Sequence, residues 1–288
     1  MPMIDAHQHY WRVAAQAQPW REAHHGAIAR DFEPDDLRPS LDKAGIAGTV
    51  VMQSVDEPDE NDRLAVYARE RTIAGVVSWL PVSDPGAARA ELDRISMPKH
   101  VGVRCLIGDD PLDWLAEPSV RQLFRDLAAR RLVWDVVPIT PAQVDRILDL
   151  ADAVPTLQIV IDHLGRPPID SGGWEPWASN VARLAQRRNI AMKVSIGINV
   201  LSAWSEWDST ALTRYVDHVL SCFGPHRLML GSNWPVVLLR TSYEQAWRDL
   251  SAALAGLVED ESAMRAMLGT TAVAVYGLKT ADVTDSAQ

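Results

Sequence analysis

Eight short apolar runs, rich in Val, Ile and Leu, alternate along the chain with segments of helical spacing, and this alternation constrains the fold more than any other feature. Parallel strands that are covered on both faces have this uninterrupted apolar character. Strands that alternate with helices in this way predict a parallel sheet built from repeated units. The runs lie at 3–6, 46–54, 73–82, 101–107, 132–138, 157–164, 190–196 and 227–236.

The segments between the runs carry helical signals. In 118–131 the apolar side chains recur at intervals of three and four residues, as they do on one face of a helix. The segment 141–154 begins with a proline directly after Thr140, which can cap a helix N-terminus. Further helices are expected at 35–44, 59–72, 85–95, 209–222 and 242–254, with a closing helix at 259–277.

Eight strands separated by helices favour a closed (β/α)8 TIM barrel over an open, doubly wound sheet. No G-x-G-x-x-G turn follows the first strand, so we expect no nucleotide cofactor. A length of 288 residues suits a barrel that forms one domain. We therefore predict a single barrel over residues 1–278 and a flexible tail at 279–288. Its active site should lie at the C-terminal ends of the strands.

The charge balance argues against a nucleic-acid partner, and the length of the apolar runs argues against a membrane span. The 28 Lys and Arg residues are scattered among 38 Asp and Glu residues, whereas nucleic-acid binding needs concentrated positive charge. No apolar run approaches the roughly 18 residues of a membrane span. The first residues do not resemble a secretion signal, and the two cysteines form no C-x-x-C pair. We expect a cytoplasmic protein that binds a small molecule, and a homo-oligomer is compatible with the sequence.

Two histidines follow the first apolar run at a spacing of two. Residues i and i+2 of a strand face the same side, so His7 and His9 would both point into the mouth of the barrel. Because imidazole is a common ligand of divalent metals, we predict that the pair forms half of a metal site. The alternative is a pair of hydrogen-bonded structural histidines.

A charged pair interrupts the sixth apolar run at Asp162 and His163. Adjacent residues of a strand point to opposite sides, so only one of the two is expected to face the lumen. We favour His163, as a third metal ligand or as the group that polarises a carbonyl. Alternatively, the two residues form a structural pair that fixes the following Gly-Arg-Pro turn.

Three motifs occur in order on the first, sixth and eighth expected strands: Asp-x-His-x-His from Asp5, Asp-His-Leu-Gly-Arg-Pro from Asp162, and Gly-Ser-Asn-Trp-Pro-Val from Gly231. Together they resemble the amidohydrolase superfamily, in particular the amidohydrolase 2 branch that contains sugar-lactone hydrolases such as fuconolactonase. The resemblance spans nearly the whole chain. It implies that an attacking water opens a lactone to the hydroxy acid.

The resemblance also implies residue roles. His7, His9 and His163 would bind a divalent metal, zinc or manganese, or polarise the carbonyl directly, and Arg104 would hold the substrate. Such groups act where negative charge develops as water adds. The residue on strand eight, Asn233 in this chain, would accept the water's proton. The remaining substrate-binding candidates are Trp11, Trp20, Arg166, Lys193 and Trp234.

Each of these candidates has a structural alternative. Arg104 suits recognition of a carboxylate or of lactone oxygens, but it could instead pair with Asp109 or Asp110. Lys193 shares a strand face with Ser195 and could hold a substrate carboxylate or hydroxyl, or snorkel from the start of its strand. Aromatic rings in the upper loops could line a pocket for a flat or sugar-like ring, or pack between helices. These rings are Trp11, Trp20, Trp174, Trp177, Trp204, Trp207 and Trp234.

The chain departs from the family pattern on strand eight, because Asn233 stands where the family carries Asp. An amide can orient a water but is not basic at neutral pH. Asn233 could be an inactivating replacement of Asp, or His163 or a metal-bound hydroxide could serve as the base. The site could also perform a decarboxylation or another lyase step, with Arg104, Arg166 and Lys193 as carboxylate anchors. A binding protein that has lost its base is a further alternative.

Overall fold

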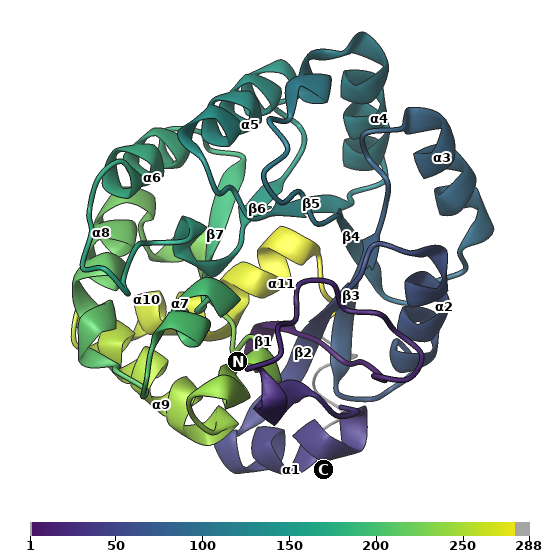
Figure 1. Cartoon of the computed structure of the whole chain (residues 1–288). Helices are drawn as coiled ribbons and strands as arrows, with labels where there is room; N and C mark the ends of the chain where they lie inside the picture. The colour runs from purple at the N-terminus through teal and green to yellow at the C-terminus, as the bar shows by residue number, and fades with distance from the viewer. Residues whose placement is uncertain (1, 280–288) are drawn as a thin grey trace.

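The computed structural model describes residues 2–279, in which eight parallel strands form one sheet in the order β1 to β8 (Figure 1). The sheet closes where the Asn233 N–H donates to the His7 carbonyl at 2.8 Å and the His9 N–H donates to the Trp234 carbonyl at 2.7 Å. The predicted (β/α)8 barrel is confirmed. The tail expected at 279–288 lies outside the described residues from residue 280 onward.

Each of the eight apolar runs overlaps one strand. The strands from β4 to β8 are shorter than their runs, and β6 and β8 end directly before the motifs that begin at Asp162 and Gly231. The strands are β1 (Met3–Gln8), β2 (Ile46–Met52), β3 (Ile73–Trp79), β4 (His100–Arg104), β5 (Val133–Val136), β6 (Ile159–Ile161), β7 (Ile190–Val194) and β8 (Leu228–Leu230).

Helices surround the strands on the outside of the barrel (Figure 1). The expected cap of α5 is present, because the Thr140 hydroxyl accepts from the Gln143 N–H while the Gln143 side chain accepts from the Thr140 N–H. The helices are α1 (Pro34–Ala44), α2 (Pro58–Tyr67), α3 (Pro85–Arg94), α4 (Pro118–Ala129), α5 (Pro141–Ala153), α6 (Trp177–Ala185), α7 (Ile198–Ala203), α8 (Thr213–Phe223), α9 (Tyr243–Ala255), α10 (Glu261–Arg265) and α11 (Thr271–Tyr276).

Two helical predictions need correction. Neither α6 nor α7 was among the expected helices, and Trp177 begins α6 rather than lying in a loop. The closing helix expected at 259–277 is divided into α10 and α11 by a π turn at Ala266–Thr270. Gly269 lies in this turn against the Pro2 carbonyl, where a side chain would not fit. The π turn therefore lets the backbone approach the start of β1 closely.

Successive side chains of a strand point alternately into two hydrophobic cores, one between the sheet and the helices and one inside the barrel. Outward residues of the strands pack against the helices, whereas inward residues fill the barrel. On β7, Ala191 belongs to the inner cluster, and Met192 and Val194 to the outer one, as the alternation predicts. Helix α11 adds Ala272 and Tyr276 to the inner cluster. This helix covers the end of the barrel opposite the loops that follow the strands.

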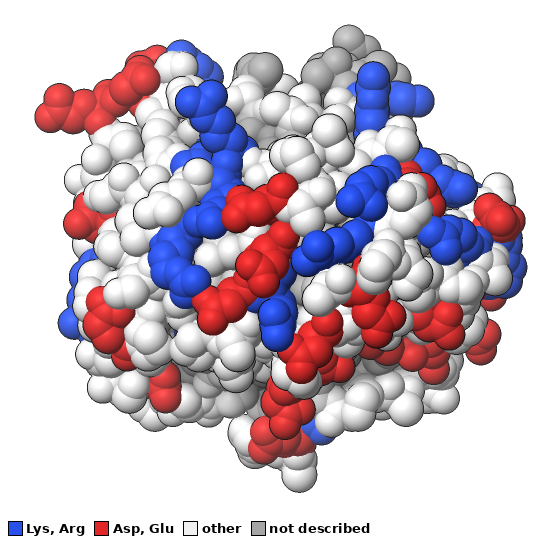
Figure 2. Space-filling view, turned by 90° about the horizontal axis from the view of Figure 1, so that it is seen from above, with Lys and Arg blue, Asp and Glu red and all other residues white. Residues whose placement is uncertain are grey.

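The outer surface carries charges of both signs. On the face shown in Figure 2, acidic and basic side chains lie among one another. This mixture matches the scattered charges of the sequence. Within residues 2–279, no helix combines the length and the apolar character needed to span a bilayer.

Candidate active site

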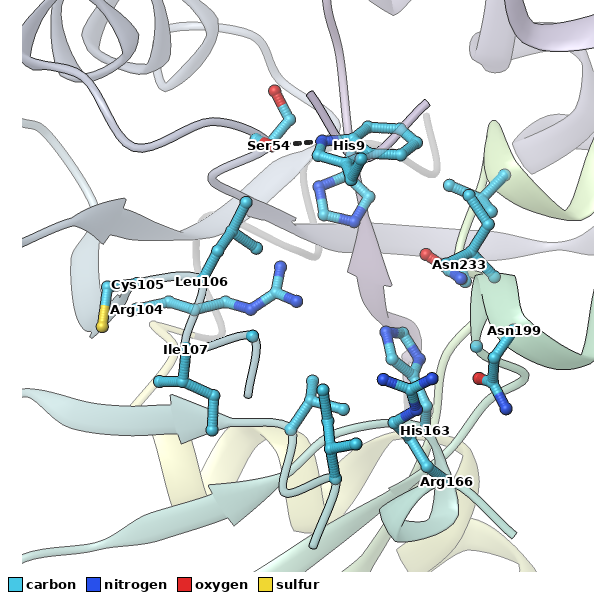
Figure 3. Close-up of a pocket in the computed structure, with 17 residues that line it drawn as sticks. His9, Ser54, Arg104, Cys105, Leu106, Ile107, His163, Arg166, Asn199 and Asn233 are labelled. Carbon is cyan, nitrogen blue, oxygen red and sulfur yellow. Dashed lines mark hydrogen bonds between the residues drawn. The ribbon is translucent and has the colours of Figure 1, made fainter. Parts of the chain in front are cut away.

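A cavity of about 240 Å³ opens at the C-terminal ends of the strands (Figure 3). Apolar side chains such as Ile107 and Val236 form much of its wall. No Asp or Glu within residues 2–279 lines it. The polar side chains on the wall are His9, Ser54, Arg104, His163, Arg166, Asn199 and Asn233.

His7, near the end of β1, and His9, just after it, lie with their rings edge to face. His9 lines the cavity, and its Nε2 lies 3.1 Å from Nε2 of the fully buried His7. Nδ1 of His9 lies 3.1 Å from the Met52 carbonyl, which can only accept, so Nδ1 carries the proton and Nε2 is an acceptor that faces His7. Burial lowers the pKa of His9 to about 3 and the pKa of His7 well below its usual range. Both rings are therefore neutral at pH 7, the form that binds a metal.

The sixth strand brings both members of its charged pair to the site, so the expectation that only one faces inward is wrong. β6 ends at Ile161, and His163 and Leu164 adopt left-handed φ angles of 53° and 54°. Alternation holds only within a strand, and this turn redirects the His163 ring. Nδ1 of His163 lies 2.9 Å from Oγ of Ser195, and its ring centroid lies 4.5 Å from that of His7.

Asp162 is the centre of a buried ionic network. Its Oδ1 lies 3.3 Å from Nδ1 of His7 and 3.1 Å from Nζ of Lys193, and its Oδ2 lies 3.3 Å from Nε of Arg104. Burial raises the pKa of this carboxyl, but the charge of Lys193 and the contacts with His7 and Arg104 outweigh burial and hold the pKa well below its usual range. Asp162 is therefore ionised at pH 7 and orients both His7 and Arg104.

Lys193 lies beneath this network and does not line the cavity, contrary to the expected contact with substrate. It is fully buried and does not snorkel to solvent. Its Nζ lies 2.7 Å from Oδ1 of Asp135, which also accepts from Oη of Tyr276 on α11 at 2.6 Å. The strand runs too deep in the barrel at this position for the ammonium to reach the mouth. Lys193 instead supports Asp162 and His7 from below.

We expect Tyr276→Phe to lower the free energy of unfolding by about 1.5–3 kcal/mol, because the phenol donates to a buried carboxylate. Urea unfolding measures this loss. Tyr67→Phe is a suitable control, since its hydroxyl lies 3.2 Å from the half-buried carboxylate of Glu33. An equal loss in both variants would contradict a special contribution of the hydrogen bond to Asp135.

The two arginines of the cavity differ in their partners. Arg104 pairs with Asp162 rather than with Asp109 or Asp110, and its Nη1 donates to the carbonyl and Oε1 of Gln53 at 3.3 and 3.2 Å. The guanidinium of Arg166 makes no ion pair or hydrogen bond with any side chain or carbonyl of residues 2–279. Arg166 is therefore available to a ligand.

Asn233 presents an acceptor to the cavity. Its φ is 55°, and its Nδ2 donates to the Ile196 carbonyl at 2.7 Å, which fixes the orientation of the amide. Oδ1 points into the cavity (Figure 3) and, although buried, has no hydrogen-bond partner within the described chain. It can accept a hydrogen bond from a water or from a substrate hydroxyl, but it cannot take up a proton.

Of the three tryptophans expected to bind substrate, one lines the cavity and two are buried away from it. Trp20 lines the cavity, and its indole donates to the Ser54 carbonyl at 2.8 Å. Trp11 and Trp234 do not line the cavity. Both side chains pack in an aromatic cluster around Phe32, with ring centroids 5.5 and 5.2 Å from that ring. Because their rings are buried in this cluster, they fix the loops after β1 and β8 and do not face a ligand.

The donors at the centre of the site fit a divalent cation. His7, Asp162 and His163 each offer a ligand atom, and these atoms lie within 4.8 Å of one another. His9 adds a neutral imidazole whose Nε2 lies 3.1 Å from Nε2 of His7. The second nitrogen of His9 meets a carbonyl and that of His163 a hydroxyl, which is the arrangement that orients histidine ligands. Nδ1 of His7 lies between the Asp162 carboxylate and the ammonium of Lys193.

The fold and the site define a barrel enzyme with a histidine-centred active site above an ionised carboxylate. The sequence model of the amidohydrolase family, described as "Amidohydrolase", matches residues 4–278, and the chain belongs to this family. The predicted resemblance is therefore confirmed, and the protein is a hydrolase of the amidohydrolase superfamily.

Relatives and solved structures agree with this assignment. The chain is 35% identical over 241 residues to L-fucono-1,5-lactonase of Burkholderia ambifaria, which covers 81% of this chain and 80% of the relative. It is 29% identical over 301 residues to the enzyme of the same name from Burkholderia multivorans, with 96% of each chain covered. A crystal structure of an amidohydrolase from Burkholderia multivorans with bound zinc has a TM-score of 0.85 at 27% identity, covering 97% of this chain and 100% of that one.

Proposed function

We propose that this protein hydrolyses a small lactone, a cyclic ester of a sugar acid or of an aromatic compound, to the open hydroxy acid. The observation that carries this proposal is the convergence of His9, His163, Arg104 and Asn233 on one cavity (Figure 3). The L-fucono-1,5-lactonases among the relatives support a lactone as substrate. The two free cysteines suit a reducing compartment, and we place the reaction in cytoplasmic carbohydrate metabolism.

We assign each side chain of the cavity a separate role in the addition of water to the lactone carbonyl. Arg104, whose guanidinium has only hydrogen-bond donors, would stabilise the carbonyl oxygen as it gains negative charge. Oδ1 of Asn233 would accept one hydrogen of the attacking water and direct its lone pair at the carbonyl carbon. In a site without metal, Nε2 of His163 would take the water's proton, because Nδ1 of this ring faces the hydroxyl of Ser195.

Burial lowers the pKa of His163 to about 3, which makes the isolated imidazole a weak base. A zinc or manganese ion held by His7, His9 and His163 would supply Lewis acidity and lower the pKa of a water. We therefore propose a metal at this site. Asp162 would keep His7 oriented toward it.

The proposal is tested with the purified protein and a panel of sugar and aromatic lactones, by following acid release with a pH indicator. We expect ring opening without release of carbon dioxide. Carbon dioxide release would favour the decarboxylase alternative. Tight binding of lactones in calorimetry without any product would favour a binding protein.

Metal removal gives a separate prediction. We expect elemental analysis to find about one divalent ion per chain, and chelation to lower lactone turnover until zinc or manganese is added back. Circular dichroism before and after chelation controls for loss of the fold. Full turnover by protein shown to be free of metal would contradict the metal proposal and leave hydrolysis by His163 in place.

A further inference from the structure

The cavity has an unbalanced charge on its wall. It contains the guanidinium groups of Arg104 and Arg166, but no carboxylate of the described residues 2–279 faces it. Buried or half-buried cations are normally paired, because an unpaired charge loses hydration without compensation. Arg104 has such a partner in Asp162, at 3.3 Å. Arg166 has no carboxylate partner among the described residues.

Arg166 is held where a ligand can reach it. It follows the β6 turn with a φ of 57° and lines the cavity beside His163 (Figure 3). Partial burial lowers the pKa of its guanidinium, and no acidic neighbour opposes this shift. A planar guanidinium with free donors binds a carboxylate through two parallel hydrogen bonds.

We propose that the substrate is a lactone that carries a carboxylate of its own, apart from the ester, and that Arg166 binds this carboxylate. The inference rests on the proposed function and narrows it to acidic lactones. The neutral imidazoles and Asn233 surround the space for the ester, whereas Arg166 supplies the one cation of the described wall that lacks a carboxylate partner. The substrate carboxylate completes the missing pair.

The rest of the wall indicates what else the substrate carries. Leu106, Ile107, Val137, Ile139 and Ile198 offer no hydrogen-bonding side chain. A hydroxyl placed against them would lose its hydration without a partner, which costs free energy. The ring edge that faces them is therefore a hydrocarbon edge. A suitable probe is γ-carboxy-γ-butyrolactone, with γ-hydroxymethyl-γ-butyrolactone as its neutral counterpart.

The experiment compares kcat/KM for these two lactones in the wild type and in Arg166→Met. We expect the wild type to prefer the carboxylated lactone by roughly 10- to 100-fold, the effect of one charge-assisted hydrogen-bonded pair. In Arg166→Met this ratio should fall to near one. Arg166→Lys keeps the charge and should retain part of the preference. Arg125→Met, an exposed position on α4, controls for a general loss of positive charge and should leave the ratio unchanged.

Other outcomes overturn the inference. Ring opening produces a carboxylate from both lactones, so an equal loss of kcat/KM for both in Arg166→Met would assign Arg166 to the product or to the reacting ester. A wild type without preference for the acid would also refute the proposal, while lactone hydrolysis itself would stand. If neither probe is hydrolysed, calorimetry with the same pair decides: selective, Arg166-dependent binding of the carboxylated lactone supports the proposal, and equal or absent binding refutes it.

Discussion

Replacing Lys193 by methionine is expected to lower the free energy of unfolding by about 3–5 kcal/mol, because it removes one partner of a buried ionic network. Asp135 and Asp162 would remain fully buried, and the ammonium that lies 2.7 and 3.1 Å from them would be gone. Asp135 would keep the hydrogen bond from Tyr276, and Asp162 its contacts with His7 and Arg104, but both carboxylates would lose the nearest positive charge. Urea unfolding at pH 7 measures the loss directly.

Two further variants make this result interpretable. Lys43→Met removes an exposed ammonium 3.6 Å from Glu244 and should change stability little, since surface pairs contribute little. The double variant Lys193→Met with Asp135→Asn should recover part of the loss, because one uncompensated charge is also removed. A Lys193→Met protein as stable as the wild type would contradict a buried ionic network around Asp162.

The barrel could be predicted because its strands are buried on both faces and therefore differ from helices along the whole chain. The two faces of β7 were predicted from the period of two residues in a strand. This period places the side chains of Lys193 and Ser195 inside the barrel and that of Met192 outside. The same period placed His7 and His9 on one side, and their Nε2 atoms lie 3.1 Å apart, although only His9 lines the cavity. These are local regularities, and a sequence records them directly.

The network around Lys193 could not be predicted, because it joins side chains from β1, β5, the β6 turn, β7 and α11. A charged residue inside the apolar run 132–138 was the available signal for Asp135, since an unpaired carboxylate is rarely buried. Nothing local indicated that Tyr276 of the closing helix reaches it. The turn after Ile161 likewise depends on left-handed residues that the strand pattern does not reveal.

The proposed mechanism of lactone hydrolysis depends more on Asn233 than on any other residue. Its Oδ1 is a buried acceptor without a partner in the described chain, and its Nδ2 is committed to the Ile196 carbonyl. In Asn233→Ala the attacking water would lose the group that orients it. We expect kcat/KM for the best lactone to fall by about 100-fold, with the larger part of the loss in kcat, because misplacement of a reacting group by about 1 Å has this effect. Steady-state kinetics measures both parameters.

Asn233→Asp separates the remaining explanations of the strand-eight residue. An aspartate in the same rotamer would set a carboxylate oxygen about where Nδ2 now lies 2.7 Å from the Ile196 carbonyl, and two acceptors at that distance repel. This repulsion raises the pKa of the introduced carboxyl, so its activity should increase with pH as the group ionises. At pH 7 we expect no gain over the wild type, and the pH profile of kcat/KM tests this. A large gain at pH 7 would contradict a site adapted to asparagine and would show that the protein lacks only a carboxylate at this position.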